Sequence, residues 1–399
     1  MKGLIFIISF EEVFTEENLY DQYFIALKGK RVHTSIIKYN EHMLANLNNL
    51  RNRLLSGNYI PNKDRKFIIY EPKKREIIAN GFEDKIVQGL LVRKVLSPLI
   101  EPKLIYDNYA SRPFMGTDEA YNRIKHFLHS YYINNHNSNN GYILKCDIKK
   151  YFYNIDIELV LKMIDKLNID ERLRNLFHIE IRPANGIDKG LCIGHELSQW
   201  LAIYYLNIVD HFIKESLNIK YYGRYMDDFY LIHSNKDYLI LYLNKIKSLL
   251  NNLKLELNKK TQIFHISEGI KFLGFHIYLT ETGKVKFILL KSSIKRMRKR
   301  MKSAYHIVND NPELIYSILE GFSSWKSHVV KGDNKHILYT LDNEFYNLYH
   351  DILIKMNINF ALYCYKPGMY EKNELGKKKN INPKYLIYSI EHYMDSIIY

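Results

Sequence analysis

The sequence predicts an α+β protein in which a small sheet is backed by helices. Three strand-like segments occur in the middle of the chain, and segments with the apolar spacing of helices separate them. The strand-like segments cover residues 142–148, 221–233 and 272–277, and the helical ones cover 159–177, 197–217 and 238–253. After residue 285 the chain becomes basic and mainly helical, so we expect a helical region to follow the sheet.

Upstream of these segments the pattern is mixed. Residues 42–55 predict a helix, and residues 82–96 predict a second helix that stops before Pro98. Between the two, residues 67–70 have the composition of a strand. The Asn-rich residues 134–140 predict a surface loop.

The composition indicates a folded protein with a polyanionic partner. Of the 399 residues, 47% are hydrophobic and 25% are charged, and the net charge is +15. A long-range positive field favours nucleic acid or an anionic membrane surface. A base-composition bias of the source genome would also raise the Lys and Asn content, so charge alone does not decide function. The longest early apolar run, residues 4–10, is too short to span a bilayer, and we expect no membrane partner.

The cysteines indicate a reducing compartment. Cys146, Cys192 and Cys364 are far apart and odd in number, which argues against a disulfide framework and against a zinc site of paired cysteines. We therefore expect a cytoplasmic protein.

Acidic residues occur next to apolar, strand-forming runs, where burying a charge costs free energy. Asp227 and Asp228 lie between two strand-forming runs within residues 221–233, and Asp147 ends the apolar run that begins at Tyr142. A hairpin would hold the adjacent pair at one edge of the sheet, and a bound cation would relieve their repulsion. Oxygen ligands without His or Cys favour Mg²⁺ or Mn²⁺. The alternative is that an isolated Asp-Asp pair merely forms a turn.

Several segments, in a fixed order, resemble the motifs of reverse transcriptases. Tyr225-Met226-Asp227-Asp228 resembles the YxDD box, and Asp147 with Tyr151-Phe152 resembles the first palm motif. The further segments that resemble family motifs are residues 70–75, 82–88, 190–199, 257–261 and 272–275. The resemblance covers roughly residues 20 to 330, and it implies a right-hand polymerase fold with fingers, an antiparallel palm sheet and a helical thumb.

The resemblance also implies roles for individual residues. Asp147, Asp227 and Asp228 would hold two Mg²⁺ ions, or Mn²⁺, with Ile148 as a further metal contact, and Lys260 is a candidate general acid for pyrophosphate. Phe152 falls at the position of the aromatic steric gate that excludes a ribose 2′-hydroxyl. The implied nucleotide-binding residues are Lys73, Lys74, Arg75, Arg112, Phe152, Ile193, Gly194 and Gln199, and Tyr225, Phe272, Leu273 and Gly274 would contact the primer.

One motif carries a signal about the subfamily. Ile193-Gly194 followed by Ser198-Gln199 resembles enzymes of diversity-generating retroelements and related bacterial, defence-associated reverse transcriptases, where many other members have Gln-Gly and Ser-Pro. Because the glutamine side chain is missing, we expect lower copying accuracy. Cys192 departs from the Pro common in the retroelement group and favours the defence setting.

The segment from Lys291 to Lys302 combines seven basic residues with a narrow apolar face. In a polymerase this would be a thumb helix that follows the duplex backbone, and the alternatives are a membrane-surface helix or a merely solvated face. The implied nucleic-acid contacts in this segment are Lys295, Arg296, Arg298, Lys299, Arg300 and Lys302. Trp325 is expected to pack in the core of this region rather than to stack on a base.

These expectations give a domain plan and a set of functions. The plan is an N-terminal helical segment (1–60), interleaved fingers and palm (61–285), a thumb (286–345) and a mainly helical C-terminal extension without an assigned role (346–399). The leading function is RNA-directed DNA synthesis with an RNA template or a dedicated non-coding RNA, a DNA primer and deoxynucleotides, in bacterial anti-phage defence. The alternatives are an error-prone retroelement enzyme, protein-primed or untemplated synthesis, a non-catalytic RNA-binding scaffold, and RNA synthesis. An accessory protein or a homo-oligomer is a further possible partner.

Overall fold

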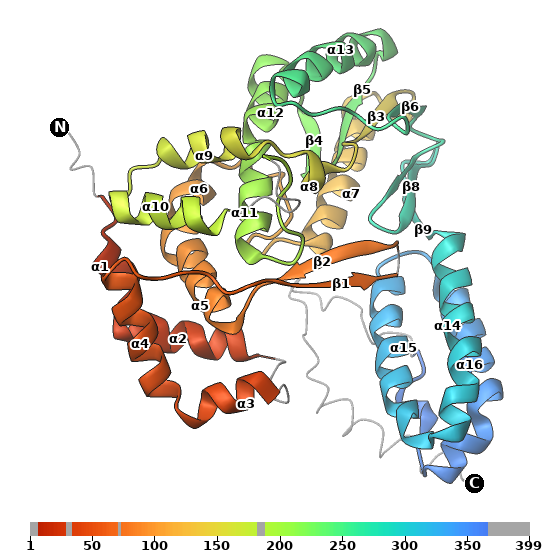
Figure 1. The fold of residues 1–399 in the computed structure, drawn as a ribbon. Helices are drawn as coiled ribbons and strands as arrows, with labels where there is room; N and C mark the ends of the chain where they lie inside the picture. Colours follow the sequence, from red (N-terminus) through yellow and green to blue (C-terminus); the bar gives the residue numbers. More distant parts are fainter. Residues whose placement is uncertain (1–6, 29–33, 71–72, 182–187, 366–399) are drawn as a thin grey trace. The chain divides into compact units, whose positions relative to one another are not determined.

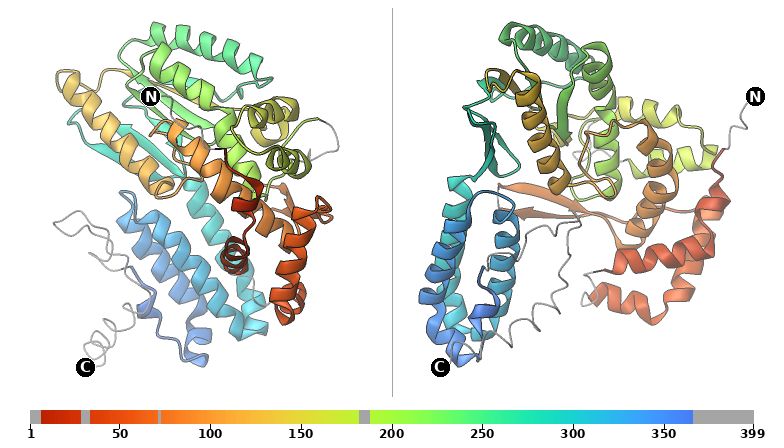
Figure 2. Two further views of the ribbon diagram at one scale, coloured as in Figure 1. Left: turned by 90° about the vertical axis from the view of Figure 1, so that its left-hand side faces the viewer. Right: turned by 180° about the vertical axis from the view of Figure 1, so that it is seen from behind.

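The structure, a computed structural model, describes residues 7–28, 34–70, 73–181 and 188–365. The chain divides into two compact units. Unit 1 contains the residues up to 131 and residues 140–265, and unit 2 contains residues 132–139 and those from 266 onward. Figures 1 and 2 show the elements of both units coloured along the sequence.

Unit 1 begins with short helices followed by a two-stranded ribbon. The first helices are α1 (Phe10–Val13), α2 (Glu16–Leu27), α3 (Thr34–Glu41) and α4 (Met43–Leu55). Strands β1 (Arg65–Ile69) and β2 (Arg75–Ala79) pair antiparallel. They are followed by α5 (Phe82–Leu90), the π-helical turn η1 (Leu91–Leu96), α6 (Ser97–Ile100) and the 3₁₀ turn η2 (Glu101–Lys103). The two helices and the strand predicted in this part of the chain are confirmed.

The centre of unit 1 is a four-stranded antiparallel sheet with the order β4-β5-β3-β6. Its strands are β3 (Tyr142–Asp147), β4 (Tyr221–Tyr225), β5 (Asp228–His233) and β6 (Gln262–His265). Because side chains alternate between faces, the buried Leu144, Phe229 and Leu231 share one face of the sheet. This face packs into the core that also contains Ile246 and Leu250 of α13 (Lys236–Asn252).

The remaining helices of unit 1 surround this sheet (Figures 1 and 2). They are α8 (Tyr151–Asn154), α9 (Ile157–Asp165), α10 (Glu171–Glu180), α11 (Glu196–Tyr205), α12 (Asn207–His211) and the π-helical turn η3 (Phe212–Ser216). Helix α7 (Thr117–Asn134) brings the rings of Phe127 and Tyr131 onto Tyr221, which lies on the face opposite Tyr222. The predicted helix over 159–177 is two helices, because Asp170 caps a new helix after the first has ended.

Unit 2 contains a small antiparallel sheet and a helical bundle. The sheet consists of β7 (Ile270–Phe272), β8 (Phe275–Leu279) and β9 (Val285–Leu289). The helical elements are α14 (Lys291–Asp310), η4 (Pro312–Leu314), α15 (Ile315–Val329), α16 (Lys335–Lys355) and η5 (Phe360–Leu362). The predicted loop over 134–140 begins at the last residue of α7, and residues 134–139 of it belong to this unit.

The end placed at residue 345 for the thumb lies inside α16. Phe345, Tyr349, Leu353 and Phe360 all pack into the core that contains Met301 of α14. Residues 346–365 therefore share their core with the helices before them, and this part of the expected extension is not a separate element. The rest of the expected extension, residues 366–399, lies outside the described residues.

No helix among the described residues has the length and apolar character needed to cross a bilayer.

A buried ion pair joins the central sheet to α12. Arg224 on β4 and Asp210 on α12 are both fully buried, and the Arg224 Nε and Nη2 atoms lie 2.7 and 2.5 Å from the two carboxylate oxygens. Burial alone would lower the pKa of Arg224, but the Asp210 carboxylate outweighs it and raises the pKa above its usual value. The Tyr222 hydroxyl donates to the same carboxylate at 2.6 Å. The Arg224 guanidinium therefore remains charged, and both oxygens of the Asp210 carboxylate accept hydrogen bonds.

We predict that Asp210→Asn strongly destabilises unit 1. The substitution keeps the size of the side chain but leaves the Arg224 charge buried without its counter-ion, which costs about 3–5 kcal/mol. Urea unfolding measures the loss. The control is Glu11→Gln, which removes the partner of the exposed Arg172 and should leave the free energy of unfolding nearly unchanged. Equal effects of the two substitutions would contradict the prediction.

Candidate active site

The predicted hairpin is present, and it places the acidic pair at the end of the central sheet. Tyr225 and Asp228 form the last pair of β4 and β5, and Met226 and Asp227 form the turn between them. Met226 has a φ of 54°, in the left-handed region that tight hairpin turns use. The Nη1 atom of Arg224 donates to the Met226 carbonyl at 2.9 Å, so the buried ion pair also supports this turn.

The register of the sheet brings Asp147 to the same end. Asp147 on β3 lies directly opposite Asp228 on β5. The next residue, Ile148, donates its N–H to the carbonyl of Asp227 at 3.3 Å. All three carboxylates are half-buried, whereas Phe229 and Tyr230 after them are buried. The three aspartates singled out in the sequence are therefore brought together.

The negative charges of Asp147 and Asp227 repel each other, which disfavours the ionised form of Asp227. Burial raises the pKa of Asp227, and Asp147 raises it further, whereas Lys145 and Arg75 act in the opposite direction. A divalent cation would relieve the repulsion between Asp147 and Asp227, and an all-oxygen donor set suits Mg²⁺ or Mn²⁺. The residues present therefore fit the metal ions that the sequence implied.

Sequence reasoning missed Lys145. This lysine lies on β3 with 11% of its side chain exposed, and it forms an ion pair with Asp228. Burial lowers its pKa to about 7, although Asp147 and Asp227 oppose the shift. A lysine two residues before Asp147, within an otherwise apolar strand, was the signal in the sequence that could have revealed it.

A second strand-like segment continues the sheet beside Asp147. Asn258 donates its N–H to the Asp147 carbonyl at 2.7 Å, and Lys149 donates its N–H to the Glu256 carbonyl at 2.9 Å. Lys260, the candidate general acid, follows in an exposed turn in which its N–H donates to Asn258 Oδ1 at 3.2 Å. The backbone therefore ties the segment that carries Lys260 to the strand that carries Asp147.

Phe152 lies against the Gly-rich segment that precedes α11. Its carbonyl accepts the N–H of Leu191 at 2.8 Å, and its side chain is half-buried. Gly190 has a φ of 88°, and a Cβ there would lie 3.2 Å from the Tyr153 carbonyl oxygen. The close approach of these two backbones explains a glycine at this position.

The same segment is attached to the β1–β2 ribbon. The Ile78 N–H donates to the Ile193 carbonyl at 2.8 Å. Gly194 has a φ of 123°, and a Cβ there would lie 2.7 Å from the Ile78 carbonyl oxygen. Arg75 at the start of β2 acts electrostatically on Asp227, and the exposed Lys73 and Lys74 precede it. Phe152, Ile193, Gly194 and Arg75 thus belong to one continuous part of unit 1.

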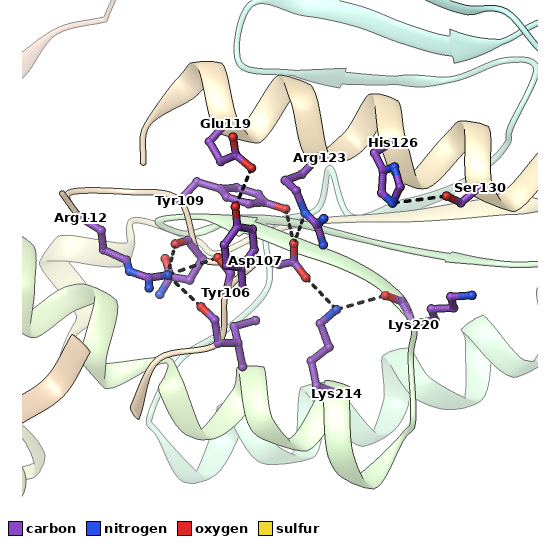
Figure 3. A network of polar contacts seen from close by, with 12 residues as sticks. Tyr106, Asp107, Tyr109, Arg112, Glu119, Arg123, His126, Ser130, Lys214 and Lys220 are labelled. Carbon is purple, nitrogen blue, oxygen red and sulfur yellow. Dashed lines mark hydrogen bonds and ion pairs between the residues drawn. The ribbon is translucent and has the colours of Figure 1, made fainter. Parts of the chain in front are cut away.

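An irregular segment closes the open edge of the sheet. Asp107 accepts the N–H of Arg224 at 2.9 Å, and Tyr109 donates its N–H to the Arg224 carbonyl at 3.0 Å. Figure 3 shows the Asp107 carboxylate between Arg123 and Lys214, whose nitrogens lie 2.8 and 3.0 Å away. A covered edge cannot pair with another chain.

Arg112 and Gln199 have different surroundings from those expected of nucleotide contacts. The Arg112 guanidinium donates to Glu101 at 2.8 Å and to the carbonyls of Ile105 and Asn108 at 2.8 and 2.7 Å, and 6% of its side chain is exposed. These bonds, shown in part in Figure 3, attach Arg112 to the edge segment. The Gln199 Oε1 atom accepts from the Ser111 hydroxyl at 2.9 Å, so it contacts the same segment.

The remaining expected nucleic-acid contacts lie in unit 2, apart from Tyr225, which is half-buried beside the turn of unit 1. Phe272 is buried, whereas Leu273 and Gly274 form a half-exposed hairpin turn with φ values of 45° and 95°. On α14, Lys295, Arg296, Lys299, Arg300 and Lys302 are exposed, and Arg298 is paired with Glu344 at 2.5 Å. Trp325 stacks on Phe322 and donates to Ser293 at 3.0 Å, which agrees with the expected packing role.

Asp64, Cys192 and His195 form a group of possible metal ligands, and it is the one such group of three among the described residues. The His195 Nε2 atom lies 3.5 Å from Asp64, and its Nδ1 atom lies 3.2 Å from the Gln88 amide nitrogen. Because that amide nitrogen also donates to Glu180 at 2.7 Å, it is a donor to His195, and the ring proton belongs on Nε2. With this proton arrangement the Nε2 atom of His195 faces the Asp64 carboxylate.

The sequence matches the family described as Reverse transcriptase (RNA-dependent DNA polymerase) over residues 60–277, more than half of the chain. The chain belongs to this family. Its α+β fold is therefore the right-hand polymerase fold that the sequence predicted.

Among solved structures, the chain is similar to telomerases. The similarity to telomerase from Candida albicans, in a complex with a fragment of telomeric RNA, has a TM-score of 0.45 at 16% identity and covers 73% of this chain and 61% of that chain. Apo telomerase from Candida tropicalis gives 0.44 at 15% identity over 88% and 71% of the two chains. The chain thus spans less than two thirds of the length of the Candida albicans protein, and these scores add nothing to the family assignment. No curated protein matches the sequence.

We predict that Gly194→Ala weakens the attachment of the β1–β2 ribbon. Any Cβ at its φ of 123° is strained, and here it also meets the Ile78 carbonyl oxygen at 2.7 Å. The matched control is Gly116→Ala, because Gly116 has a φ of 118° and open space around it. The strain alone costs about 1–2 kcal/mol, and the clash adds roughly 1–3 kcal/mol at residue 194. Denaturant unfolding of both variants measures their free energies of unfolding. Equal losses of stability would show that the ribbon moves away from the added Cβ without cost.

Proposed function

We propose that this protein is an RNA-directed DNA polymerase that extends a primer with deoxynucleotides. The observation that carries the proposal is the convergence of Asp147, Asp227 and Asp228 at one end of the antiparallel sheet. An inert scaffold would have no need to hold three carboxylates so close together, because their mutual repulsion destabilises it. Family membership supports the same chemistry.

The chain's own residues divide the work of the reaction. Asp147, Asp227 and Asp228, with Ile148 beside them, would hold two Mg²⁺ ions, or Mn²⁺, and these would supply activation of the primer hydroxyl and stabilisation of the leaving pyrophosphate. The triphosphate is held by Arg75, Lys73 and Lys74, whose side chains carry the opposite charge. The ribbon that carries them is fixed in place by its hydrogen bond to Ile193. Lys260 donates a proton to the departing pyrophosphate. The Phe152 ring blocks the space that a 2′-hydroxyl would need.

We assign the nucleic-acid contacts by charge and exposure. The β1–β2 ribbon and the α5 region serve as fingers, the central sheet as the palm, and α14 with the helices after it as the thumb. The exposed basic residues of α14 bind the phosphate backbone of a template–primer duplex, and the Leu273-Gly274 turn contacts the primer. The net charge of +15 supports a polyanionic partner.

The setting that the sequence favours is bacterial anti-phage defence in the cytoplasm, with a dedicated non-coding RNA as the template. Cys192 at the place of the usual proline supports this setting over mutagenic retrohoming. The side chain of Ile193 offers no polar group to the template or nucleotide, which supports synthesis of lower accuracy. Neighbouring genes distinguish the two settings, because a variable-repeat target gene would indicate retrohoming.

We predict that the purified chain incorporates deoxynucleotides on a primed RNA template in Mg²⁺ or Mn²⁺. Asp227→Asn should lower the rate by roughly 100-fold or more, because it removes charge at the reacting centre without changing size. The control is Asp237→Asn, since Asp237 is an exposed residue in the first turn of α13. Primer extension with and without added template measures both. A rate unaffected by Asp227→Asn would exclude this site, and activity without added template would indicate a co-purified RNA or protein priming.

We predict that Phe152→Val relaxes the choice of sugar. The smaller side chain leaves room for a 2′-hydroxyl, so the preference for deoxynucleotides over ribonucleotides should fall by roughly 10- to 100-fold. The ratio of kcat/KM for matched deoxy- and ribonucleotides measures this. Tyr153→Val, at the neighbouring half-buried position, serves as the control and should leave the ratio unchanged. An unchanged ratio in Phe152→Val would show that another residue senses the sugar.

A further inference from the structure

Phe114 is the most exposed large hydrophobic side chain among the described residues. Its relative exposure is 103%, so the whole ring lies in water and the fold gains no burial from it. Its backbone has a φ of 60°, in the left-handed region, which costs free energy in a residue that carries a Cβ. A glycine would adopt this backbone more easily. Two costs at one residue are expected where the side chain has a function.

The loop that carries Phe114 is held firmly. The Arg112 guanidinium donates to a carboxylate and to backbone carbonyls of the preceding chain (Figure 3). Pro113 has a fixed φ because of its ring. The Gly116 N–H donates to the Tyr109 carbonyl at 2.8 Å and closes the loop. The Phe114 ring therefore projects from a fixed support, so little conformational freedom is lost when a ligand packs against it.

The loop is bonded to the strand that leads into the acidic turn. Tyr109 donates its N–H to the Arg224 carbonyl at 3.0 Å, and the Arg224 guanidinium donates to the Met226 carbonyl within the turn at 2.9 Å. The Ser111 hydroxyl also donates to Gln199 on α11 at 2.9 Å. The loop therefore shares its supports with the candidate active site.

We propose that Phe114 stacks on an unpaired base of the RNA template. This inference rests on the proposed function, because the template is the strand that brings unpaired bases to a site that extends a primer. A base within the template–primer duplex already stacks on its neighbours, so only an unpaired base offers a free face to the ring. Every base has such a face, so the contact holds the template without selecting its sequence.

The surroundings of the ring favour one base over a protein surface. A stable protein interface involves roughly 20–30 residues on each side. The tip of this loop offers a single ring, flanked by the exposed Pro113 and the half-exposed Met115. This area suits one flat base, and the net charge of +15 favours a nucleic acid.

The test compares the binding of two primed RNAs, one with an unpaired template overhang and one blunt, by fluorescence anisotropy without deoxynucleotides. We expect Phe114→Leu, which removes the flat ring, to weaken binding of the overhang RNA by about 10-fold and to leave binding of the blunt duplex unchanged. Phe114→Trp keeps a flat ring and should bind the overhang RNA as well as the wild type does. The matched control is Phe24→Leu, at an exposed phenylalanine of α2, which should change neither affinity.

A second measurement locates the contact on the protein. A 5-iodouridine placed singly along the overhang crosslinks under ultraviolet light to an aromatic side chain that stacks on it, and mass spectrometry identifies the residue. We expect a crosslink to Phe114 from an unpaired position. Crosslinks to other residues alone would overturn the proposal, and so would the loss of a homo-oligomer in Phe114→Leu, which would make the ring a protein contact.

Neither measurement requires synthesis, so the two ideas can fail separately. If the wild type extends primers but Phe114→Leu binds the overhang RNA as tightly as the wild type does, this inference is wrong and the proposed function stands. If the overhang RNA binds through Phe114 but no condition gives primer extension, the proposed function is wrong and the stacking contact stands.

Discussion

The ion pair between Arg224 and Asp210 is the interaction on which the site depends most. Its guanidinium contacts an α12 carboxylate, the Ile203 carbonyl of α11 and the Met226 carbonyl of the turn, so one side chain connects two helices to the acidic hairpin. The backbone of the same residue pairs with Asp107 and Tyr109 at the sheet edge. A buried charge requires this complete set of partners, and the requirement fixes the hairpin in one position. The half-buried carboxylates can then repel one another without opening the turn.

Much of the fold, and the choice of the three carboxylates, could be predicted from the sequence because the patterns that indicate them lie within short segments. A hairpin with two apolar strands and an acidic pair at its turn is defined within residues 221–233, and the strand that ends at Asp147 is defined within six residues. The glycines at residues 190 and 194 were also part of a recognisable segment, and the structure gives each of them a positive φ. Short-range patterns of this kind do not require knowledge of what packs against them.

The features that did not follow from the sequence depend on contacts that are made only in the folded chain. Arg112 was expected to bind phosphate, and its guanidinium is bonded to Glu101 and to carbonyls of the edge segment, contacts that no periodicity reveals. The end expected at residue 345 lies within α16, whose residues pack into the same core as Met301 on both sides of that point. Lys145 was not singled out in the sequence, because its contact with Asp228 depends on which residue of β5 lies diagonally across from it. Burial and register are properties of the folded chain as a whole.

The bond between Ile193 and the β1–β2 ribbon has an evolutionary consequence. The attachment uses the Ile193 carbonyl, a group that every amino acid supplies, and it accepts the Ile78 N–H at 2.8 Å. Natural selection can therefore exchange the side chain at residue 193 while the backbone link to the ribbon persists. A substitution at residue 193 keeps this bond, whereas the neighbouring Gly194 has almost no freedom to change. Two adjacent residues in one motif thus differ in the substitutions that the backbone geometry tolerates.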